Sequence, residues 1–569
     1  MLTSTSLVWL LLTLAAILIG VPAAWRRLEL SRAKHPSIAG HAKLSRRIAA
    51  QLPFVSYDEQ KFFACDGAPD PIVVQRKSAF DRLAAASRQR APASVALTAE
   101  LERGLSDVLF TDTYRVPFQF REHVRRHLRI GSVVDASRGT QLKDLDGHWS
   151  YDLSGSYGVN LFGYDFYKSC IAAGAARVAD LGPVLGPYHP LIRDNVERIK
   201  AISGLDEVSF HMSGTEAVMQ AVRLAQFHTR RRRVALFCGA YHGWWDGVQP
   251  GLGNRRRIND VYTLKEMSAQ TLHVLATRND IACVLVNPLQ ALHPNSSAPG
   301  DTALIDGGRT AAFDRAAYTE WLRELRQVCT ERGIVLIFDE VFLGFRLARG
   351  GAQEYFGVRA DLVTYGKTLG GGLPIGVLCG TREHMKRFRD DRPTDGCFAR
   401  GTFNSHPYVM AAMNEFLHRL DTPEIRATYV DLDARWNERA RVLNARLAAA
   451  GAPVRVANMV SVWTVLYDRP SRYNWMFQYY LRAEGLTLSW VGTGRLIFSH
   501  NYTDADFAEV VERFTRAAEK MLRDGWWWTP AGATNKTVRR TILRELLRAR
   551  FGGRREAQPA TGTAITERP

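Results

Sequence analysis

Three short segments of the chain hold residues that could do chemistry, and each follows an apolar, strand-like run. The first centres on Lys367, which stands just before the triple glycine 370–372. A lysine beside a desolvated pocket keeps its amine neutral more readily than one in water, so Lys367 is a candidate nucleophile. The adjacent glycines would let the backbone approach a bound ligand closely.

The second segment ends in a carboxylate. Asp339 follows the fully apolar run 334–338. A carboxylate at the mouth of a buried strand must either pair with a cationic group or remain in water. This position therefore predicts a charged binding partner or an exposed site.

The third segment resembles a cradle for an anion. Ser213, Gly214 and Thr215 break a strand-like piece and precede an amphipathic, helix-like pattern. A helix start offers free N–H groups and the positive end of the helix dipole, which suits a phosphate. Ser and Thr are also ordinary helix N-caps, so that structural interpretation stays open.

The surrounding pattern alternates short apolar runs with amphipathic helices. The runs are 234–238, 283–286, 334–338 and 376–379, and residues 318–332 form one of the expected helices. Continuous apolar runs separated by helices predict buried parallel strands in an α/β sheet. Ligands in such sheets bind where strands end and helices begin, so the three segments should meet there.

Five motifs together resemble one enzyme family. They are Ser-Gly-Thr-Glu-Ala (213–217), Gly-Ala-Tyr-His-Gly (239–243), Phe-Asp-Glu-Val (338–341), Tyr-Gly-Lys-Thr-Leu-Gly-Gly-Gly-Leu-Pro (365–374) and Gly-Thr-Phe (401–403). In these motifs the chain is similar to the class III, fold-type I pyridoxal-phosphate aminotransferases. Within that class it most resembles glutamate-1-semialdehyde aminomutase and the aminotransferase domains embedded in polyketide and peptide synthetases. The second likeness rests on 158–163, 350–357 and 401–407, and the resemblance covers residues 106–525.

The resemblance implies pyridoxal 5'-phosphate as the cofactor and assigns a role to each motif. Lys367 would form the aldimine with the cofactor and later carry the proton between substrate and cofactor. Asp339 would pair with the pyridine nitrogen, so that the ring stays an electron sink. Val341 would pack behind the ring.

The same resemblance assigns the remaining contacts to the cofactor. Tyr241 would stack on the other face of the ring, with His242 beside it. The phosphate would be held by Ser213, Gly214 and Thr215. Thr402 would reach the phosphate of the partner subunit's cofactor, which requires a homodimer.

The chain departs from the family pattern at two places. Asn287 stands where relatives usually carry Glu, so a local charge is lost. No arginine is an obvious carboxylate clamp, although Arg400 lies near the right neighbourhood. A missing clamp favours an aldehyde, a ketone or a carrier-bound β-keto acyl acceptor, and hence an acyl carrier protein as a possible partner.

Two further functions stay open beside an aminotransferase that uses an amino donor and a carbonyl acceptor. An aminomutase would use the same residues but return the amino group to the same molecule. A catalytically silent membrane scaffold would use the cofactor only structurally. The first alternative differs in its substrates, the second in having no chemistry.

The N-terminus suggests a membrane anchor. Residues 7–25 are an almost unbroken apolar run without charge, long enough to cross one bilayer. A cleaved secretory peptide is the competing interpretation, although its positively charged leader is missing. Basic residues follow at once, so the sequence predicts a single-pass membrane protein with its catalytic domain in the cytoplasm.

Positive charge is concentrated at the two ends. The net charge is +18, and residues 26–50 and 531–569 contribute +6 each. The tail pattern at 537–551 fits an amphipathic helix on anionic lipid or a solvated tail. Because the body carries little net charge and shows no known binding module, no nucleic-acid partner is expected.

Composition and motif positions set the predicted domain organisation. With 569 residues, 46% of them hydrophobic, the chain is long and apolar enough for large globular units, which excludes a disordered chain or a disulfide miniprotein. Seven cysteines without a Cys-x-x-Cys pair predict neither a disulfide framework nor a metal site. His123 and His127 are the nearest approach to a metal pair and lack a third ligand. We expect an anchor at 1–25, a basic, alanine-rich and partly helical connector at 26–105, the enzyme at 106–530 and a basic tail at 531–569. The large cofactor domain should span about 185–410, with a smaller α+β domain built from the segments that flank it.

Overall fold

The computed structural model describes residues 4–35, 41–254, 256, 258–295, 311, 313–489 and 494–551. A seven-stranded sheet lies at its centre, in the order β4-β10-β9-β8-β7-β5-β6. In that order the strands are Glu207–His211, Gly376–Gly380, Leu362–Gly366, Val335–Asp339, Ile281–Val286, Arg233–Phe237 and Val261–Leu264. β10 runs antiparallel to both of its neighbours, and the pairs from β9 to β6 are parallel. The mostly parallel α/β sheet is confirmed.

The four apolar runs correspond to β5, β7, β8 and β10, with boundaries that differ by up to two residues. The prediction that all four are parallel strands is wrong for β10, which is antiparallel to β9 and β4. The cause is physical. Every residue of β10 is buried, as in β7 and β8, so its apolar character records burial on both faces and not direction.

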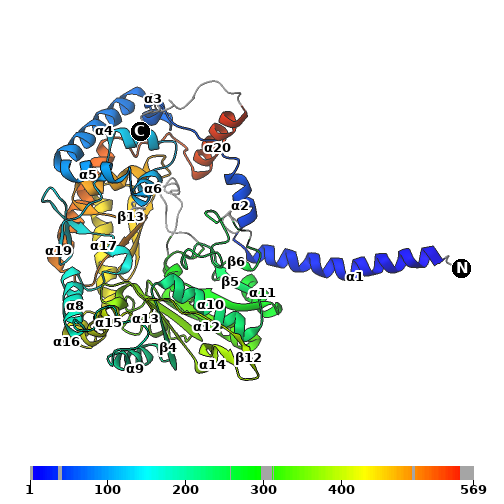
Figure 1. The fold of residues 1–569 in the computed structure, drawn as a ribbon. Coiled ribbons are helices and arrows are strands. Elements are labelled where there is room, and N and C mark those ends of the chain that lie inside the picture. The colour runs from blue at the N-terminus through cyan, green and yellow to red at the C-terminus, as the bar shows by residue number, and fades with distance from the viewer. Residues whose placement is uncertain are drawn as a thin grey trace, which may run out of the picture.

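Helices lie around the large sheet (Figure 1). Those that contact its strands are α9 Ile192–Ser203, α10 Gly214–Thr229, α12 Arg315–Arg332 and α14 Arg382–Met385. α11 Ala269–Thr277 and α13 Gly351–Phe356 pack on α12, and α8 Tyr164–Arg177 and α15 Pro407–Arg419 pack on each other. α12 shows why they form where they do. The Asp314 side chain caps its first turn by accepting the N–H of Ala317, and Gly333, at φ 57°, ends it.

Segments that precede and follow the large sheet in the sequence together build a smaller α+β part. One sheet has the order β1-β2-β3-β15, formed by Ala136–Arg138, Gln141–Lys143, Trp149–Asp152 and Leu486–Thr487. The other is β13-β14-β16, formed by Val454–Met459, Val462–Tyr467 and Arg495–Ile497. Around them lie α16 Pro423–Ala427, α17 Leu432–Ala449, α18 Phe477–Ala483 and α19 Asp504–Arg523. Because β15 pairs with β3 in parallel, distant parts of the chain meet in one sheet.

Short elements complete the chain. A hairpin is formed by β11 Phe388–Arg389 and β12 Arg392–Gly396. The 3-10 turns are η2 Gly155–Gly158, η3 Pro288–Leu292, η5 Lys367–Gly370 and η6 Asn474–Met476. η5 begins at Lys367, and Gly158 of η2 packs against the side chain of that lysine.

The segment expected to be a connector is a packed helical layer. Its helices are α2 Ala42–Ala49, α3 Glu59–Ala64, α4 Asp70–Arg90 and α5 Pro92–Leu101, followed by α6 Ser106–Tyr114 and α7 Arg121–His127. Arg76 of α4 is fully buried, pairs with Asp66 at 2.7 Å and donates to the carbonyl of Gly525 at 2.9 Å. The layer is therefore held against the C-terminal part of the chain.

The tail forms helix α20, Asn535–Phe551, beside this layer (Figure 1). Glu545 accepts two guanidinium hydrogen bonds from Arg472, at 3.0 and 3.1 Å, and one from the hydroxyl of Tyr57 at 2.5 Å. We call Tyr57, Arg472 and Glu545 the terminal clamp. The first part of the expected tail is thus held against the protein, while residues 552–569 lie outside the described residues.

The predicted single-pass membrane localisation is wrong. Among the described residues, no helix combines the length and the apolar character needed to cross a bilayer. The helix that begins in the apolar segment, α1 Ser4–Ala33, contains Pro22 and continues through the basic residues that were expected to follow an anchor. Its last turns pack on α11, where Glu29 lies 3.1 Å from His273. The membrane scaffold loses its basis with this anchor.

Candidate functional site

All of the candidate segments end at one edge of the large sheet. β5, β7, β8 and β9 run in one direction, and β4 shares that direction because both β4 and β9 oppose β10. The residues at these carboxyl ends are Ser213, Tyr241, Asn287, Asp339 and Lys367. This edge is where ligands bind in open α/β sheets.

The backbones approach each other so closely there that only glycine fits. A Cβ added at Gly376 would lie 1.9 Å from the carbonyl oxygen of Ser213. One added at Gly214 would lie 2.5 Å from Cγ1 of Val341, and one at Gly366 would lie 3.2 Å from the same atom. Val341 therefore packs between the start of α10 and the residue before Lys367. The structure brings the anion cradle, the end of β8 and the lysine segment together.

Lys367 combines an unusual backbone with a desolvated amine. Its φ of 47° lies in the left-handed region, which non-glycine residues rarely adopt and which costs about 1–3 kcal/mol. Burial lowers the pKa of Lys367 below its ordinary value, nearby Asp339 partly raises it, and Arg346 and Arg495 lower it further. Within the described residues, no hydrogen bond or ion pair engages the amine. The neutral, reactive form is therefore favoured.

Asp339 is buried and held on several sides. Its Oδ2 lies 2.8 Å from Nδ1 of His242. Its Oδ1 accepts the N–H of Val341 at 3.2 Å and the hydroxyl of Thr364 at 3.4 Å. An ionised carboxylate only accepts, so Nδ1 of His242 carries the proton of this contact. His242 thus orients Asp339. The sequence had predicted only that His242 lies beside the cofactor ring.

The start of α10 is built as an anion cradle. The Ser213 side chain accepts the N–H of Glu216 at 3.3 Å, and the first N–H groups of the helix have no partner within it. A Cβ at Gly243 would lie 2.6 Å from Oγ1 of Thr215, so the loop after β5 closes over the cradle. The dipole of this 16-residue helix adds positive potential.

Tyr241 faces outward from the same loop. Its side chain is 60% exposed, while that of His242 is almost fully buried. Burial and the charge of Asp339 raise the pKa of Tyr241, which places its ring near that carboxylate. Asn287 donates to the carbonyl of Tyr241 at 3.1 Å. The residue that replaces the usual Glu therefore fixes the loop that carries the aromatic ring.

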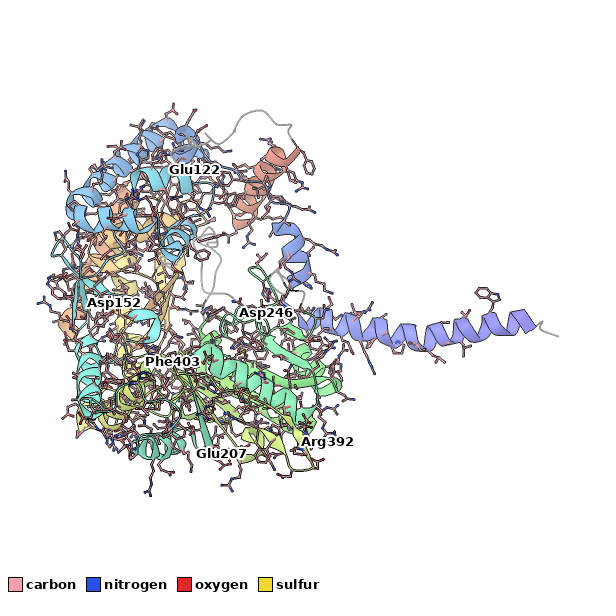
Figure 2. All side chains as sticks on the ribbon, viewed as in Figure 1. Glu122, Asp152, Glu207, Asp246, Arg392 and Phe403 are labelled. Carbon is pink, nitrogen blue, oxygen red and sulfur yellow. The ribbon has the colours of Figure 1, made fainter. Side chains whose placement is uncertain are left out.

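Two expected residues lie on the surface of the single chain. Thr402 and Arg400 are both exposed, as is their neighbour Phe403, which is labelled in Figure 2. Within the described part of the chain, neither residue contacts Lys367 or Asp339. Thr402 therefore belongs to the site only if a second subunit brings it there, and Arg400 is no clamp within one subunit.

The sequence motifs did not reveal two of the groups around the lysine, Arg346 and Phe342. Arg346 is buried and donates to Ser461, to the carbonyl of Phe498 and, at 3.4 Å, to the carbonyl of Gly158. The amine nitrogen of Lys367 lies over the ring of Phe342, 5.5 Å from the ring centre. A Cβ at Gly158 would lie 2.7 Å from Phe342 and 3.3 Å from Cδ of Lys367. Arg346 and Phe342 follow the Asp339 motif within seven residues, which was the available signal.

The described residues fit pyridoxal phosphate. The free N–H groups of α10 and the hydroxyls of Ser213 and Thr215 suit its phosphate. Asp339 suits a protonated ring nitrogen, and Lys367 presents an amine without a partner. Nε2 of His242 is buried without a hydrogen-bond partner among the described residues, which leaves polar capacity in the site for a ligand.

No metal centre accompanies this site in the described chain. It contains no group of three or more His, Cys, Asp or Glu side chains arranged to hold an ion. His123 packs instead among aromatic rings. Its ring centre lies 4.2 Å from that of Phe62 and 4.6 Å from that of His127. Burial lowers the pKa of His123 to about 4, as expected for a neutral core histidine.

Comparison with known proteins gives a consistent picture. The model of the family described as Aminotransferase class-III matches residues 123–518. A glutamate-1-semialdehyde 2,1-aminomutase of Nitratidesulfovibrio vulgaris is 32% identical over 415 residues, covering 70% of this chain and 95% of the relative. A β-phenylalanine aminotransferase structure from Variovorax paradoxus is 25% identical with a TM-score of 0.59, covering 78% and 96%. A glutamate-1-semialdehyde aminomutase structure from Pseudomonas aeruginosa, 17% identical, shares the fold at a TM-score of 0.60, covering 80% and 99%.

Proposed function

The chain belongs to the class-III aminotransferases, and from this premise we propose that it moves an amino group from a donor amine onto a carbonyl acceptor at Lys367. Enzymes of this class depend on pyridoxal 5'-phosphate, which is the cofactor here. When bound, the cofactor supplies an electron sink that stabilises negative charge on the substrate carbon. The protein must hold it, orient the substrate and move protons.

Lys367 is proposed as the reacting amine and as the base that moves a proton at the substrate carbon. Its lowered pKa favours the neutral amine, which is the form that accepts a proton. The left-handed backbone of Lys367 and its packing against Gly158 leave the side chain little freedom. A base held in one orientation lowers the entropic cost of proton transfer.

Asp339 and His242 are proposed to set the charge at the ring nitrogen of the cofactor. Asp339 would keep that nitrogen protonated, and the contact of 2.8 Å from His242 holds the carboxylate in place. Tyr241 would cover the open face of the ring and Val341 the other. Ser213, Gly214 and Thr215 would hold the phosphate.

A homodimer is proposed because one expected phosphate contact is missing from the single chain. Thr402 of the partner subunit would complete the phosphate site, in agreement with the exposure of Thr402. Phe403 is 51% exposed beside it, and burial of such an apolar side chain favours association.

The acceptor is proposed to be an aldehyde, a ketone or a β-keto acyl group on a carrier protein. The exposure of Arg400 supports this choice, because it leaves no carboxylate clamp at that position within one subunit. Arg495 and Arg346 influence Lys367 electrostatically, but Arg346 is already bound to protein carbonyls. An acyl carrier protein therefore remains a proposed partner.

The single observation that carries the proposal is the convergence of Lys367, Asp339 and the α10 cradle at one sheet edge. Borohydride reduction of the purified protein, followed by peptide mass spectrometry, tests it. A pyridoxyl group is expected on Lys367. The same group on another lysine, or on none, contradicts the assignment.

An aminomutase is a second candidate, supported by the relatives of that name, one of them 32% identical. The two functions differ in stoichiometry. An aminotransferase converts an acceptor only when a separate amino donor is present, whereas an aminomutase turns over one substrate alone. Incubation of glutamate-1-semialdehyde as the sole substrate decides between them, since 5-aminolevulinate would form only through the mutase.

A further inference from the structure

Two backbone segments in the left-handed conformation meet beside the reacting amine. One is Lys367 itself, at φ 47°. The other is η2, in which φ is positive at Gly155, Ser156, Tyr157 and Gly158. Residues with side chains rarely adopt this conformation, and it persists only where the surrounding contacts hold it. The contacts around these two segments therefore carry the strain on both sides of the lysine.

A buried carboxylate and a tyrosine hold η2. Oδ2 of Asp152 accepts the hydroxyl of Tyr164 at 2.6 Å. The oxygen of that hydroxyl lies 2.9 Å from Oγ of Ser156, which is within the turn. Gly158 ends the turn, at a position where an added Cβ would lie 3.3 Å from Cδ of Lys367. The turn therefore forms a fixed wall along the lysine side chain.

The backbone that follows the lysine lies between two helices, α8 and α15, which pack side by side (Figure 1). A Cβ added at Gly371 would lie 2.3 Å from the carbonyl oxygen of Ala412 in α15. One added at Gly372 would lie 3.2 Å from Cβ of Tyr167 in α8. The segment that begins at Lys367 is therefore wedged between these helices.

Tyr167 joins the two strained segments through one buried hydroxyl. Its oxygen accepts the N–H of Leu161, which follows η2, at 3.0 Å. The same hydroxyl is hydrogen-bonded to Oγ1 of Thr368, the residue after Lys367. Tyr164 and Tyr167 are three residues apart in the first turn of α8, so they lie on one face of the helix. One helical turn thus holds both segments.

We propose that Tyr167 is a positioning residue, which holds the lysine segment against η2 so that the reacting amine keeps one orientation. This inference rests on the proposed role of Lys367 as the reacting amine. Tyr167 acts through the side chain of Thr368 and the backbone of Leu161. A nucleophile that is held in one orientation reacts faster, because it loses less freedom in the transition state.

Capture of pyridoxal phosphate by the cofactor-free protein tests this role without a turnover assay. Capture joins the amine nitrogen of Lys367 to the aldehyde carbon of the cofactor and releases water. Stopped-flow absorbance at several cofactor concentrations gives a maximal rate and a half-saturating concentration. Tyr167→Phe should lower the maximal rate at least about tenfold. It should leave the half-saturating concentration unchanged, because the α10 cradle stays intact.

Tyr480→Phe is the matched control. Tyr480 is also buried, in α18, where its hydroxyl donates to Asp524 at 2.6 Å and accepts Nε1–H of Trp526 at 2.8 Å. Each variant loses two hydrogen bonds, so both should lower the melting temperature by similar amounts. Only Tyr167→Phe should slow capture. Equal slowing in both variants would reflect a general loss of stability and overturn the proposal.

Thr368→Val removes the other end of the same hydrogen bond and keeps the test decisive if Tyr167→Phe does not fold. It should lower the maximal rate as well. The double variant should be no slower than the slower single variant, because both changes break one contact. Effects that multiply in the double variant, or a wild-type maximal rate in either single variant, overturn the proposal.

Inorganic phosphate separates the lysine from the anion cradle. It should compete with the cofactor equally well in the wild type and in both single variants. A changed inhibition constant would place the defect at α10 and overturn the proposal.

Peptide mass spectrometry after borohydride reduction separates this inference from the proposed function. If the wild type captures no cofactor on Lys367, the proposed function fails and this inference fails with it. If the wild type captures it there and Tyr167→Phe does so at the same maximal rate, this inference alone fails.

Discussion

Two buried clusters of charged groups in this protein differ in how far their hydrogen bonds are satisfied. In the terminal clamp, Arg472 reaches both oxygens of Glu545, the hydroxyl of Tyr57 and the carbonyl of Cys65. Around Lys367, by contrast, Nε2 of His242 is buried without a hydrogen-bond partner, and no hydrogen bond engages the lysine amine among the described residues. Leaving buried polar groups unpaired costs free energy. A saturated cluster fixes the fold, whereas an unsaturated one keeps its groups available for a ligand.

The largest expected effect comes from the unsaturated cluster. Lys367→Ala should lower the rate of amino transfer by at least about a thousandfold, because no other amine can replace the reacting group. Its thermal unfolding should stay close to that of the wild type, since the amine makes no hydrogen bond to lose. Steady-state assays and calorimetry measure the two quantities.

Lys536→Ala, which removes an exposed lysine from α20, is the matched control. It should alter neither quantity. An active Lys367→Ala enzyme, or one that is inactive only because it unfolds, would remove the contrast between the clusters.

Asp339→Asn should have the next largest effect, a loss of about a hundredfold or more in kcat. The amide keeps the size of the side chain and part of its hydrogen bonding but removes the charge for the ring nitrogen. The exposed carboxylate of Asp395 provides the control Asp395→Asn, which should keep full activity. Wild-type kcat in Asp339→Asn would show that this carboxylate is structural, like that of Glu545 in the clamp.

The saturated cluster should respond in the opposite way. Arg472→Met leaves Glu545 without its main partner and should lower the free energy of unfolding by about 2 kcal/mol. Urea unfolding followed by tryptophan fluorescence measures it. The folded variant should retain its kcat, because the clamp touches none of the proposed site residues.

Glu545→Gln is the internal check. It should lower the free energy of unfolding by less than Arg472→Met does, because its amide oxygen can still accept a hydrogen bond from Arg472. A kcat loss in Arg472→Met without any loss of stability would show that the clamp acts on the site.

The smallest effect concerns pH. Because the pKa of Lys367 is lowered, the amine of the cofactor-free protein should become neutral, and capture pyridoxal phosphate, at a lower pH than an ordinary lysine. Below this pKa the rate of capture should fall about tenfold per pH unit. Stopped-flow absorbance gives the profile.

Two variants should shift this profile in opposite directions. Asp339→Asn removes an influence that raises the pKa of Lys367, so its profile should move to lower pH. Arg346→Met removes one that lowers it, so its profile should move to higher pH. Shifts in the same direction would contradict this account of the amine.

The sequence predicted the strand ends around the site because glycines and hydroxyls interrupt apolar runs there. It did not predict the direction of β10, since a strand buried on both faces has the same composition in either orientation. Nor did it predict the contact of His242 with Asp339, which joins residues 97 positions apart. The apolar run before Trp25 was misjudged because its pattern does not show where the helix ends.

The helical character of residues 26–105 was expected, but the packing of this layer on distant chain was not. Its alanine-rich composition resembles a linker, but its aromatic residues pack on chain that comes some 400 residues later: Phe62 on Trp475 and Phe63 on Trp526. The expected role of Thr402 stays a prediction, because it depends on a second subunit.

The contacts of Phe62, Phe63 and Arg76 carry a practical consequence for anyone who shortens this protein. A truncated version limited to residues 123–518, the span shared with relatives, would discard those three side chains and also Trp526. Trp475 and Tyr473, which are now buried, would then face water and form an exposed hydrophobic patch. Such a shortened protein should aggregate during purification, whereas a version that keeps residues 57–551, and with them the terminal clamp, should yield material fit for assay.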